Sequence, residues 1–380
     1  MGQIDIAKAG LLSPKTLREE IVRDIDQMEA INGDGRTASA SSEFPVVNLD
    51  APEETYFTIG GAVAPMRPID RDSESPIGTL GDIDEEKIDT TYYSEKLMPE
   101  KETDAKLNSE REVLSLFRWA AMDLRTKILL AREKYCWQGD SEVEGLIGED
   151  GSTAHSDIPQ SNIITPSTAW SDTTNAEPYA DITDLILELR EANQTFFDAN
   201  VDTSSRGYFS PRLWHDIKNN GDMRDRFSGV EIQRLNTEQV ERLIDDELPE
   251  IRIVEVDIPR TDGDGNYLDE DGNIVTDVDD AAMDNVLEPY DPNAGEQVRC
   301  AVIGKPGASS AFQPWFEDNV GAFDDVDAPD HVGDFAIDGT RGFGTHTWMK
   351  ADPPTSVLRA FQDVGFHLHL PDHWGIIQDI

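Results

Sequence analysis

The region from Ser109 to Gly139 carries the strongest helix signal in the chain. Ser109 and Glu112 form a capping box, and one apolar stripe then follows a single helical face. The stripe consists of Val113, Phe117, Ala120, Leu124, Ile128, Ala131 and Tyr135. At 1.5 Å per residue this helix is roughly 40 Å long, the span of a whole small domain. The sequence therefore predicts one long helix around which a flat subunit is organised.

Net charge restricts the solvent in which such a chain is stable. The 380 residues include 77 Asp plus Glu and 32 Lys plus Arg, for a formal net charge of -45 at pH 7. Self-repulsion of this size destabilises a compact state in dilute buffer, and concentrated salt screens it. A disordered acidic protein is the alternative, but 38% hydrophobic residues, with 7 Trp and 14 Phe, suffice for a sizeable core. We expect a folded protein from a salt-loving host.

Other features disfavour several classes of protein. Cys136 and Cys300 lack metal-type spacing and are predicted to be free thiols in a reducing compartment. We find no signal peptide and no apolar run near the roughly 18 residues that a membrane span needs. Basic clusters that would neutralise phosphates are few, which argues against a DNA-binding module. We expect synthesis in the cytoplasm and no membrane contact.

The chain before the long helix has two parts. Ser13-Pro14 begins an amphipathic arm whose apolar residues are Leu17, Ile21, Ile25 and Met28. The stretch from Thr37 to Asn108 is rich in Ser, Pro, Gly and acidic residues, with short β-like pieces at Phe44–Leu49, Tyr56–Ile59 and Ile88–Tyr93. Its composition fits an extended β-hairpin lying across another surface or a disordered linker, and both interpretations remain open.

The chain after the long helix indicates a mixed α/β domain. Predicted helices cover Asp181–Phe197, Arg212–Asn220 closing at Gly221, and a third helix capped by Thr237. The first buries Ile182, Leu185, Ile186 and Leu189, and the third buries Val240, Leu243 and Ile244. Predicted strands cover Tyr208–Phe209, Ile251–Val256, Val298–Ile303, Phe343–Met349 and Val364–Leu370. An acidic excursion, Asp257–Gln297, interrupts the domain.

Three histidines near the end of the sequence suggest a metal site. His367 and His369 would project from one face of a strand, with His373 close behind, at a spacing that zinc sites use. The neighbouring residues are apolar, however, and no partner general base is evident. We interpret these residues as packed or solvent-edge histidines, with a metal site as the alternative.

A second cluster resembles a calcium loop. Asp262, Asp264 and Asn266 match its first three ligand positions, but Tyr267 and Asn273 replace the required glycine and bidentate glutamate. Two Asp/Asn-Gly turn signals therefore favour a short surface hairpin around Tyr267. The alternative is a loose site for calcium, magnesium or sodium, formed by Asp262, Asp264, Asn266 and Asp269.

The glycine-rich stretches lack the spacing of phosphate-binding loops. Gly304–Gly307 and Gly342–Gly344 match neither GxxxxGK[ST] nor GxGxxG, and we predict turns there. The sequence thus contains no coherent catalytic constellation and no cofactor motif, which favours a protein that is not an enzyme.

The order of parts resembles the Hong Kong 97-type shell fold of tailed-phage major capsid proteins. A local stretch strengthens this resemblance: Trp170 precedes Asp181-Ile182 at the start of a helix, and Ser210 to Trp214 leads from a strand into a short helix. This pattern is similar to lambda-type head proteins and encapsulin-like shells, and the residue-level match extends to about Val256.

The resemblance implies an α+β fold with five regions. They are an N-terminal arm at 1–36, an extended E-loop region at 37–108, a spine helix and peripheral domain at 109–178, an axial domain at 179–345, and peripheral-domain return strands at 346–380. The acidic segment 257–297 departs from the family pattern as an insertion in the axial domain. Nothing before the arm resembles a fused scaffolding domain.

The function implied by the resemblance is self-assembly as hexamers and pentamers into an icosahedral virion capsid, assembled in the cytoplasm of a haloarchaeal host. It would enclose double-stranded DNA without sequence-specific binding, alongside a portal and decoration or scaffolding proteins. One alternative is an encapsulin-like cellular shell. Another, of a different class, is a halophilic metalloenzyme that uses the C-terminal histidines.

Overall fold

The structure is a computed structural model of the chain. It describes residues 37–44, 53–60, 82–89, 91–97, 110–140, 143–149, 151, 154–192, 205–226, 235–244, 250–262, 266–291, 295–304, 309–311, 334–338, 343–351, 354–368 and 370–380. The predicted N-terminal arm and the helix cap Ser109 lie outside these residues.

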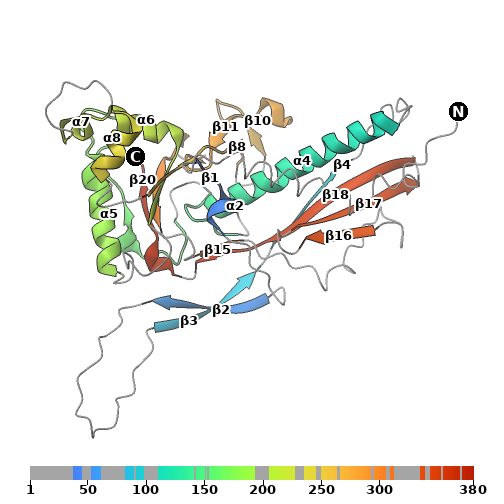
Figure 1. Cartoon of the computed structure of the whole chain (residues 1–380), viewed down its shortest axis with the longest axis horizontal. Helices are drawn as coiled ribbons and strands as arrows, with labels where there is room; N and C mark the ends of the chain where they lie inside the picture. Colours follow the sequence, from blue (N-terminus) through green and yellow to red (C-terminus); the bar gives the residue numbers. More distant parts are fainter. Residues whose placement is uncertain are drawn as a thin grey trace, which may run out of the picture.

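A six-stranded mixed sheet forms the body of the molecule at the left of Figure 1. In spatial order its strands are β1 (Thr37–Ala38), β7 (Glu250–Val254), β6 (Arg206–Phe209), β14 (Cys300–Gly304), β20 (Gly375–Gln378) and β5 (Ile163–Ile164). Strand β14 is antiparallel to both neighbours, whereas the β1–β7, β6–β7 and β20–β5 pairs are parallel. The sheet thus joins strands from distant parts of the sequence.

Both faces of this sheet are buried. Val302 and Ile376 belong to one hydrophobic core, which we call the first core. Their neighbours Ile303 and Ile377 belong to another, the second core. This two-residue alternation is the side-chain period of a strand, and burial on both faces explains the continuous apolar run of β14. The second core is covered by α5 (Pro178–Ala192), α6 (Pro211–Asn219), α7 (Gly221–Arg226) and α8 (Thr237–Ile244).

Helix α4 (Glu110–Trp137) is 28 residues long and links the first core to a second sheet. Figure 1 shows it running along the long strands of that four-stranded antiparallel sheet. The strands, in spatial order, are β16 (Asp334–Asp338), β17 (Phe343–Ala351), β18 (Pro354–Val364) and β4 (Thr91–Leu97). Ala120, Leu124 and Ile128 of the predicted stripe are buried, which confirms the orientation of the helix.

A two-stranded ribbon extends from the body. Strands β2 (Glu53–Gly60) and β3 (Asp82–Asp89) pair antiparallel along their whole length, from Glu53↔Asp89 to Gly60↔Asp82. Among the described strands they pair only with each other, and Figure 1 shows them below the rest of the molecule. The hairpin interpretation of this region is therefore confirmed for these residues.

The acidic segment Asp257–Gln297 forms three small antiparallel ribbons. They pair β8 (Asp257–Pro259) with β11 (Met283–Asn285), β9 (Tyr267–Leu268) with β10 (Ile274–Val275), and β12 (Tyr290–Asp291) with β13 (Glu296–Gln297). The predicted hairpin around Tyr267 is confirmed. The segment is more than a surface excursion, however, because Val286 and Leu287 are fully buried in the first core.

The remaining short elements are α2 (Ala40–Glu43), β15 (Ser309–Ala311), β19 (Phe366–Leu368), and the 3-10 helices η2 (Gln160–Asn162), η3 (Val278–Asp280) and η4 (Pro371–His373). The predicted α+β class is confirmed, as are the three later helices and the strands near Tyr208, Ile251 and Val302.

Several local predictions are wrong. Phe44 is not in a strand, because its N–H closes a turn of α2 on the Ala40 carbonyl at 2.9 Å. Asn236, not Thr237, caps α8: the Asn236 Oδ1 accepts from the Gln239 N–H at 2.9 Å. Gly344 lies within β17 rather than in a turn.

The predicted end of α6 is confirmed to within one residue, because the helix ends at Asn219, but Gly221 does not act as its stop. Gly221 is the first residue of α7, because the Asn220 side chain accepts a hydrogen bond from the Met223 N–H at 3.2 Å and starts a new helix. The chain therefore turns directly from one short helix into the next.

Two predicted region boundaries differ from the strand pairing. The region 346–380 was expected to form one set of return strands, but it is divided between different sheets: β17 and β18 lie in the four-stranded sheet, and β20 lies between β14 and β5 in the six-stranded sheet. Ile376 of β20 packs in the first core and Ile377 packs in the second, because the two faces of the six-stranded sheet border different cores. Conversely, β16 and the start of β17 precede residue 346 yet belong to the four-stranded sheet, and β1, from the 37–108 region, pairs with β7.

Candidate functional site

The segment Thr37–Phe44 fixes the chain to the body just before the β2–β3 ribbon. We call it the anchor segment; it comprises β1, α2 and Phe44. Residues 1–36 precede it in the sequence, so it separates the two parts that the sequence predicts to need a partner surface. Strand β1 adds it to the edge of the six-stranded sheet, with Thr37 opposite Ile253 and Ala38 opposite Val254.

Phe44 inserts into an aromatic cluster at the end of the anchor segment. Its ring centroid lies 5.3 Å from that of Trp137, 5.4 Å from that of Phe366 and 6.0 Å from that of Trp374. All four side chains are buried. Edge-on aromatic contacts of this kind add to the free energy gained by burial alone. The anchor is thus joined to α4, β19 and the residue after η4.

A buried carboxylate on α4 holds the start of α2. Glu133 Oε1 accepts from the Ala40 N–H at 2.8 Å, and Oε2 accepts from the Trp137 indole N–H at 3.1 Å. Burial raises the pKa of Glu133 to about 7, although both hydrogen bonds and the charge of Arg132 act to lower it. The site therefore holds an acid whose charge changes near neutral pH.

The other end of α2 joins a cluster of ions. Glu43 Oε2 lies 2.6 Å from Arg206 Nη1 and accepts a hydrogen bond from the Tyr208 hydroxyl at 2.7 Å. Arg206 Nε contacts Glu250 Oε2 at 2.5 Å, and Arg252 also pairs with Glu250. Burial acts to lower the pKa of Arg206, but the bonds to Glu250 and Glu43 outweigh it and keep that pKa above its usual range.

This ion cluster connects α2 to β6 and β7. Burial and the charge of Glu43 raise the pKa of Tyr208 well above its usual range, so the hydroxyl stays protonated and remains a donor. Removing one partner of a buried pair leaves an uncompensated charge, which typically costs 3–5 kcal/mol. Helix α2 is therefore fixed at both ends, at Ala40 by Glu133 and at Glu43 by Arg206 and Tyr208.

Sequence reasoning did not predict this site. The available signal was Glu133, an acid placed between Leu130 and Trp137 at helical spacing, on a row that is otherwise apolar. A charged residue in such a position indicates a buried partner, but not which distant residue supplies it.

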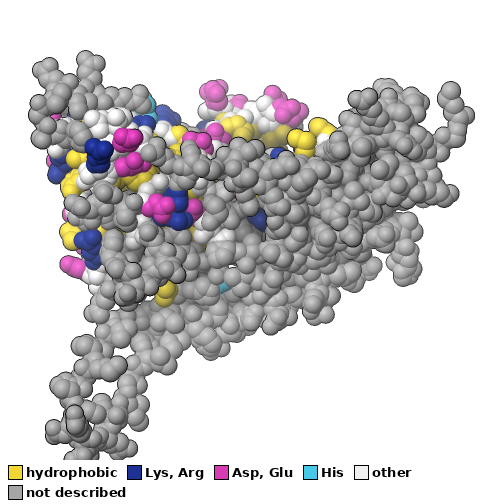
Figure 2. Space-filling model, viewed as in Figure 1, with side chains coloured by type: hydrophobic (Ala, Val, Ile, Leu, Met, Phe, Trp, Pro, Cys, Tyr) yellow, Lys and Arg dark blue, Asp and Glu magenta, His cyan; other side chains and the backbone are white. Residues whose placement is uncertain are grey.

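Among the described residues outside the anchor segment, large apolar side chains are exposed on α4, in the acidic segment, and at Leu187 of α5, which is 47% exposed. On α4, Trp119 and Met122 are 61% and 50% exposed. In the acidic segment, Ile274, Val278 and Met283 are 64%, 43% and 55% exposed. Figure 2 shows hydrophobic side chains between acidic ones over the region of β8, β10 and β11. Exposed apolar groups beside one another are typical of contact surfaces.

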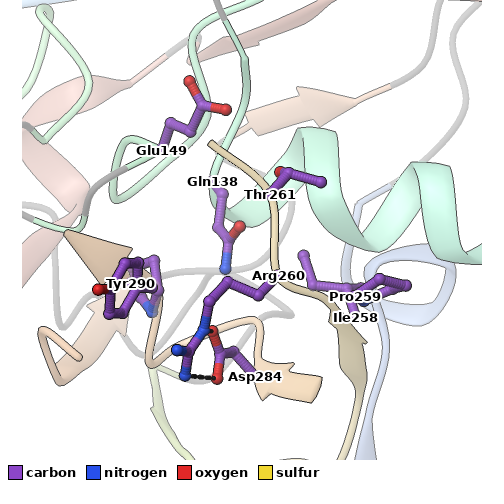
Figure 3. Close-up of a pocket in the computed structure, with 9 residues that line it drawn as sticks. Gln138, Glu149, Ile258, Pro259, Arg260, Thr261, Asp284 and Tyr290 are labelled. Carbon is purple, nitrogen blue, oxygen red and sulfur yellow. Dashed lines mark hydrogen bonds and ion pairs between the residues drawn. The ribbon is translucent and has the colours of Figure 1, made fainter. Parts of the chain in front are cut away.

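A small pocket lies at the base of the acidic segment (Figure 3). It is lined by Gln138, Glu149, Ile258, Pro259, Arg260, Thr261, Asp284, Pro289 and Tyr290. Arg260 pairs with both carboxylate oxygens of Asp284, at 2.7 and 2.9 Å, and its guanidinium lies 4.2 Å from the Tyr290 ring centroid. These three side chains all belong to the acidic segment, so their contacts hold parts of this segment to one another. The segment is joined to the body by other bonds, such as the one that the Gln138 side chain donates to the Val286 carbonyl at 3.0 Å.

The predicted cation ligands lie in two separate turns. Asp262 accepts hydrogen bonds from the Asn266 backbone and side chain, at 2.8 and 2.9 Å. Asp269 accepts from Asn273 at 2.8 and 3.1 Å, and the bond from the Asn273 backbone lowers the pKa of Asp269. Asp264 lies outside the described residues. Cation binding in this loop stays a prediction.

The predicted metal-binding histidines are buried where the structure describes them. His367 lies in β19 opposite Ser310, and His373 lies in η4; both are at most 3% exposed, and His369 is outside the described residues. Over the described ranges, no group of three or more His, Cys, Asp or Glu side chains is placed to hold a metal ion. Cys136 and Cys300 are buried free thiols, and burial raises the pKa of Cys136.

No helix in the described part of the chain is long and apolar enough to cross a membrane.

Comparisons with known proteins identify similar solved structures but no sequence relative. No protein-family model matches the chain, and no curated protein matches it. A putative capsid protein of a prophage from E. coli CFT073 is similar at a TM-score of 0.49 and 11% identity, covering 96% of this chain and 98% of that one.

Two further structures have comparable similarity. The capsid of an empty GTA particle has a TM-score of 0.47 at 12% identity, covering 90% of this chain and 96% of that one. A phage-related protein from Bordetella bronchiseptica RB50 has a TM-score of 0.46 at 12% identity, covering 90% and 91%. The chain spans nearly the whole length of each of these proteins.

Proposed function

We propose that this chain is the major capsid protein of a tailed virus and has the Hong Kong 97-type shell fold. In this proposal the six-stranded sheet with α5–α8 is the axial domain, α4 is the spine helix, the β2–β3 ribbon is the E-loop, and the four-stranded sheet is the peripheral domain. Copies assemble as hexamers and pentamers into an icosahedral head. The role is structural rather than enzymatic.

The observation that carries the proposal is the β2–β3 ribbon. Its two eight-residue strands pair only with each other among the described strands, and they extend away from the body (Figure 1). An isolated two-stranded hairpin is marginally stable in water, and it gains stability by joining further strands or packing on another element. A neighbouring copy of the chain supplies that surface, which makes the contact between subunits interlocked.

The anchor segment supports this role mechanically. Phe44 and Ala40 contact residues of α4, and Glu43 pairs with Arg206 of β6, so the chain is held to the body before it enters the ribbon. A preorganised attachment lowers the entropy lost when the ribbon binds a neighbour. The exposed Trp119 and Met122 on α4 provide apolar surface for contacts of the same kind.

The net charge supports a haloarchaeal host. Subunits with a formal charge of -45 approach each other most easily where salt screens their repulsion. An acidic inner wall would also keep packaged double-stranded DNA from adhering, so the DNA is enclosed without sequence-specific binding. A portal and decoration or scaffolding proteins complete the virion, and the head is assembled in the host cytoplasm.

Deleting the ribbon tests this function. A variant in which a short flexible linker replaces residues 53–89 keeps the anchor segment, both cores and α4. We expect a folded, soluble subunit that forms no shells in molar salt, whereas the intact chain forms closed particles by sizing chromatography and electron microscopy. A matched variant with a shortened β9–β10 turn should still form particles.

Three outcomes would count against the proposal. An intact chain that remains a compact 42.2 kDa monomer in high salt contradicts assembly. Particles that form normally without the ribbon contradict its assigned role. Native particles that contain a protein cargo instead of DNA would favour the encapsulin-like alternative.

A further inference from the structure

Glu133 is the acceptor on which the start of α2 depends. Ala40 is the first residue of α2, and the first N–H groups of a helix have no partner within the helix. The Ala40 N–H donates to Glu133 Oε1 at 2.8 Å, in a place where Ala40 is fully buried and Glu133 is 4% exposed. Without this acceptor the N–H would be left buried and unsatisfied, a costly arrangement.

The charged and titratable groups around the anchor segment come from four elements. They are Arg132 on α4, Glu43 on α2, Arg206 and Tyr208 on β6, and Glu250 and Arg252 on β7. Glu43, Arg206, Glu250 and Arg252 pair among themselves. Glu133 instead accepts hydrogen bonds from two neutral donors, the Ala40 backbone N–H and the Trp137 indole N–H.

Glu133 is therefore the carboxyl in this cluster whose charge is least supported. Burial opposes its ionisation most strongly, the nearby charge of Glu43 opposes it further, and the favourable charge of Arg132 does not compensate. Cys136, one turn along, adds no charge, because burial raises the pKa of its thiol and keeps it protonated. Neutral donors stabilise either protonation state less selectively than a paired cation would.

We propose that Glu133 is a proton-operated latch that sets how firmly the anchor segment is held against α4. With the carboxyl protonated, its burial carries no charge penalty and the segment is firmly attached. With the carboxyl ionised, attachment must bury a charge, so local opening of the segment becomes more frequent. The opening itself does not require assembly; its consequence, a looser presentation of the ribbon to a neighbouring subunit, rests on the proposed function.

The direction with pH follows from linkage. The pKa of Glu133 is about 7 in the attached state and returns toward 4.5 when the segment opens and the carboxyl meets water. The attached state therefore takes up a proton between these values, and attachment is strongest below pH 4.5, weakens as pH rises, and levels off above pH 7. A difference of this size corresponds to a change in the opening equilibrium on the order of 100-fold.

Hydrogen exchange of the full chain tests the latch. Amide exchange in the peptides that cover 37–44 is measured in molar salt at about pH 5 and pH 8, corrected for the intrinsic dependence of exchange on pH. In the unsubstituted chain, we expect protection of Ala40 and Phe44 to fall by roughly 10-fold to 100-fold at the higher pH. Strand β14, which contains no carboxylate, is the internal reference.

Glu133→Gln removes the titration but keeps an oxygen that can accept from the Ala40 N–H. We expect its protection at 37–44 to be the same at both pH values. Glu288→Gln is the matched control, because Glu288 is as buried as Glu133, at 3% exposed, but accepts a hydrogen bond from Ser210 at the base of the acidic segment. This control should keep the pH response of the unsubstituted chain.

Two results would overturn the latch. One is a Glu133→Gln chain that retains the full pH response; the other, which needs no variant to fold, is an unsubstituted chain whose 37–44 protection follows that of β14 at every pH. Electron microscopy of the same samples separates this proposal from the proposed function. Shells without a pH response contradict the latch alone, whereas a pH response without shells contradicts the capsid function alone.

Discussion

Phe44 packs edge-on against Trp137, with their ring centroids 5.3 Å apart and their planes inclined by 66°. This contact joins the end of the anchor segment to the last residue of α4. It places a rigid attachment directly before the ribbon that we propose to bind a neighbouring subunit.

Replacing Phe44 with Ala tests this attachment. Loss of a buried aromatic ring, with the cavity it leaves, should lower the free energy of unfolding by about 3–5 kcal/mol. Denaturant unfolding in molar salt measures the change. Phe44→Leu refills part of the cavity and should cost less. Equal stability of the Ala variant and the unsubstituted chain would show that the aromatic cluster does not hold the anchor.

Leu124 and Met122 provide a matched pair on α4. Leu124 is fully buried and Met122 is 50% exposed. Leu124→Asp should prevent folding, because an unpaired buried ion costs several kcal/mol, whereas Met122→Asp should leave a folded subunit. Circular dichroism and soluble yield measure the outcome. Normal particles from Leu124→Asp would mean that this face of α4 is not in the core.

Trp119 tests the outer face of the same helix. Because its side chain is 61% exposed, Trp119→Ser should change subunit stability by less than about 0.5 kcal/mol. If this face contacts a neighbour, the salt concentration needed to keep particles intact should rise, since large aromatic residues contribute strongly to interfaces. Light scattering across a salt series measures this. An unchanged dissociation point would exclude Trp119 from the subunit contacts.

The base and the tip of the acidic segment should respond differently to substitution. Asp284→Ala removes the bidentate partner of the partly buried Arg260 guanidinium, and the expected cost is about 2 kcal/mol. Replacing the turn 269–273 with Asn-Gly keeps the β9–β10 pairing and should be nearly neutral. Thermal unfolding of both variants compares them. If Asp284→Ala were neutral and the replacement of the turn 269–273 were destabilising, the tip and not the base would stabilise the segment.

Dilution of salt tests the charge argument. The Debye length grows from about 3 Å at 1 M to about 10 Å at 0.1 M, so repulsion between subunits increases as salt is removed. Particles dialysed into about 0.1 M monovalent salt with chelator should swell or dissociate, and sulfate should protect better than chloride at equal ionic strength. If particles stay intact for days in dilute buffer, repulsion between the acidic subunits does not control their assembly, and the net charge affects only the solubility of the protein.

The sequence predicts elements whose information is local. The apolar stripe through Leu124 identifies α4 and its buried face, and Ser210-Pro211 identifies the start of α6, where Ser210 Oγ accepts from the Leu213 N–H at 3.0 Å. The turn signals around Tyr267 likewise predict the β9–β10 hairpin, because the turn and both strands lie within ten residues or so.

Long-range partners could not be predicted in the same way. Ile376 and Ile377 are apolar residues of the kind found in buried strands, but no local pattern shows that β20 pairs with β14 rather than with a strand of the four-stranded sheet. The four-residue α2 has too little length for helical periodicity, and its acceptor, Glu133, lies 93 positions away. The candidate site depends on such distant pairs, so its residues were missing from the sequence-based prediction.

The central claim is that a second copy of the chain stabilises the β2–β3 ribbon in a closed shell. Electron cryomicroscopy of the full chain, purified in molar salt, measures this directly. The account predicts icosahedral particles in which the ribbon of each subunit lies against an adjacent subunit and the anchor segment keeps its contacts with α4. A homogeneous monomer, or particles in which every ribbon folds back onto its own subunit, would contradict it.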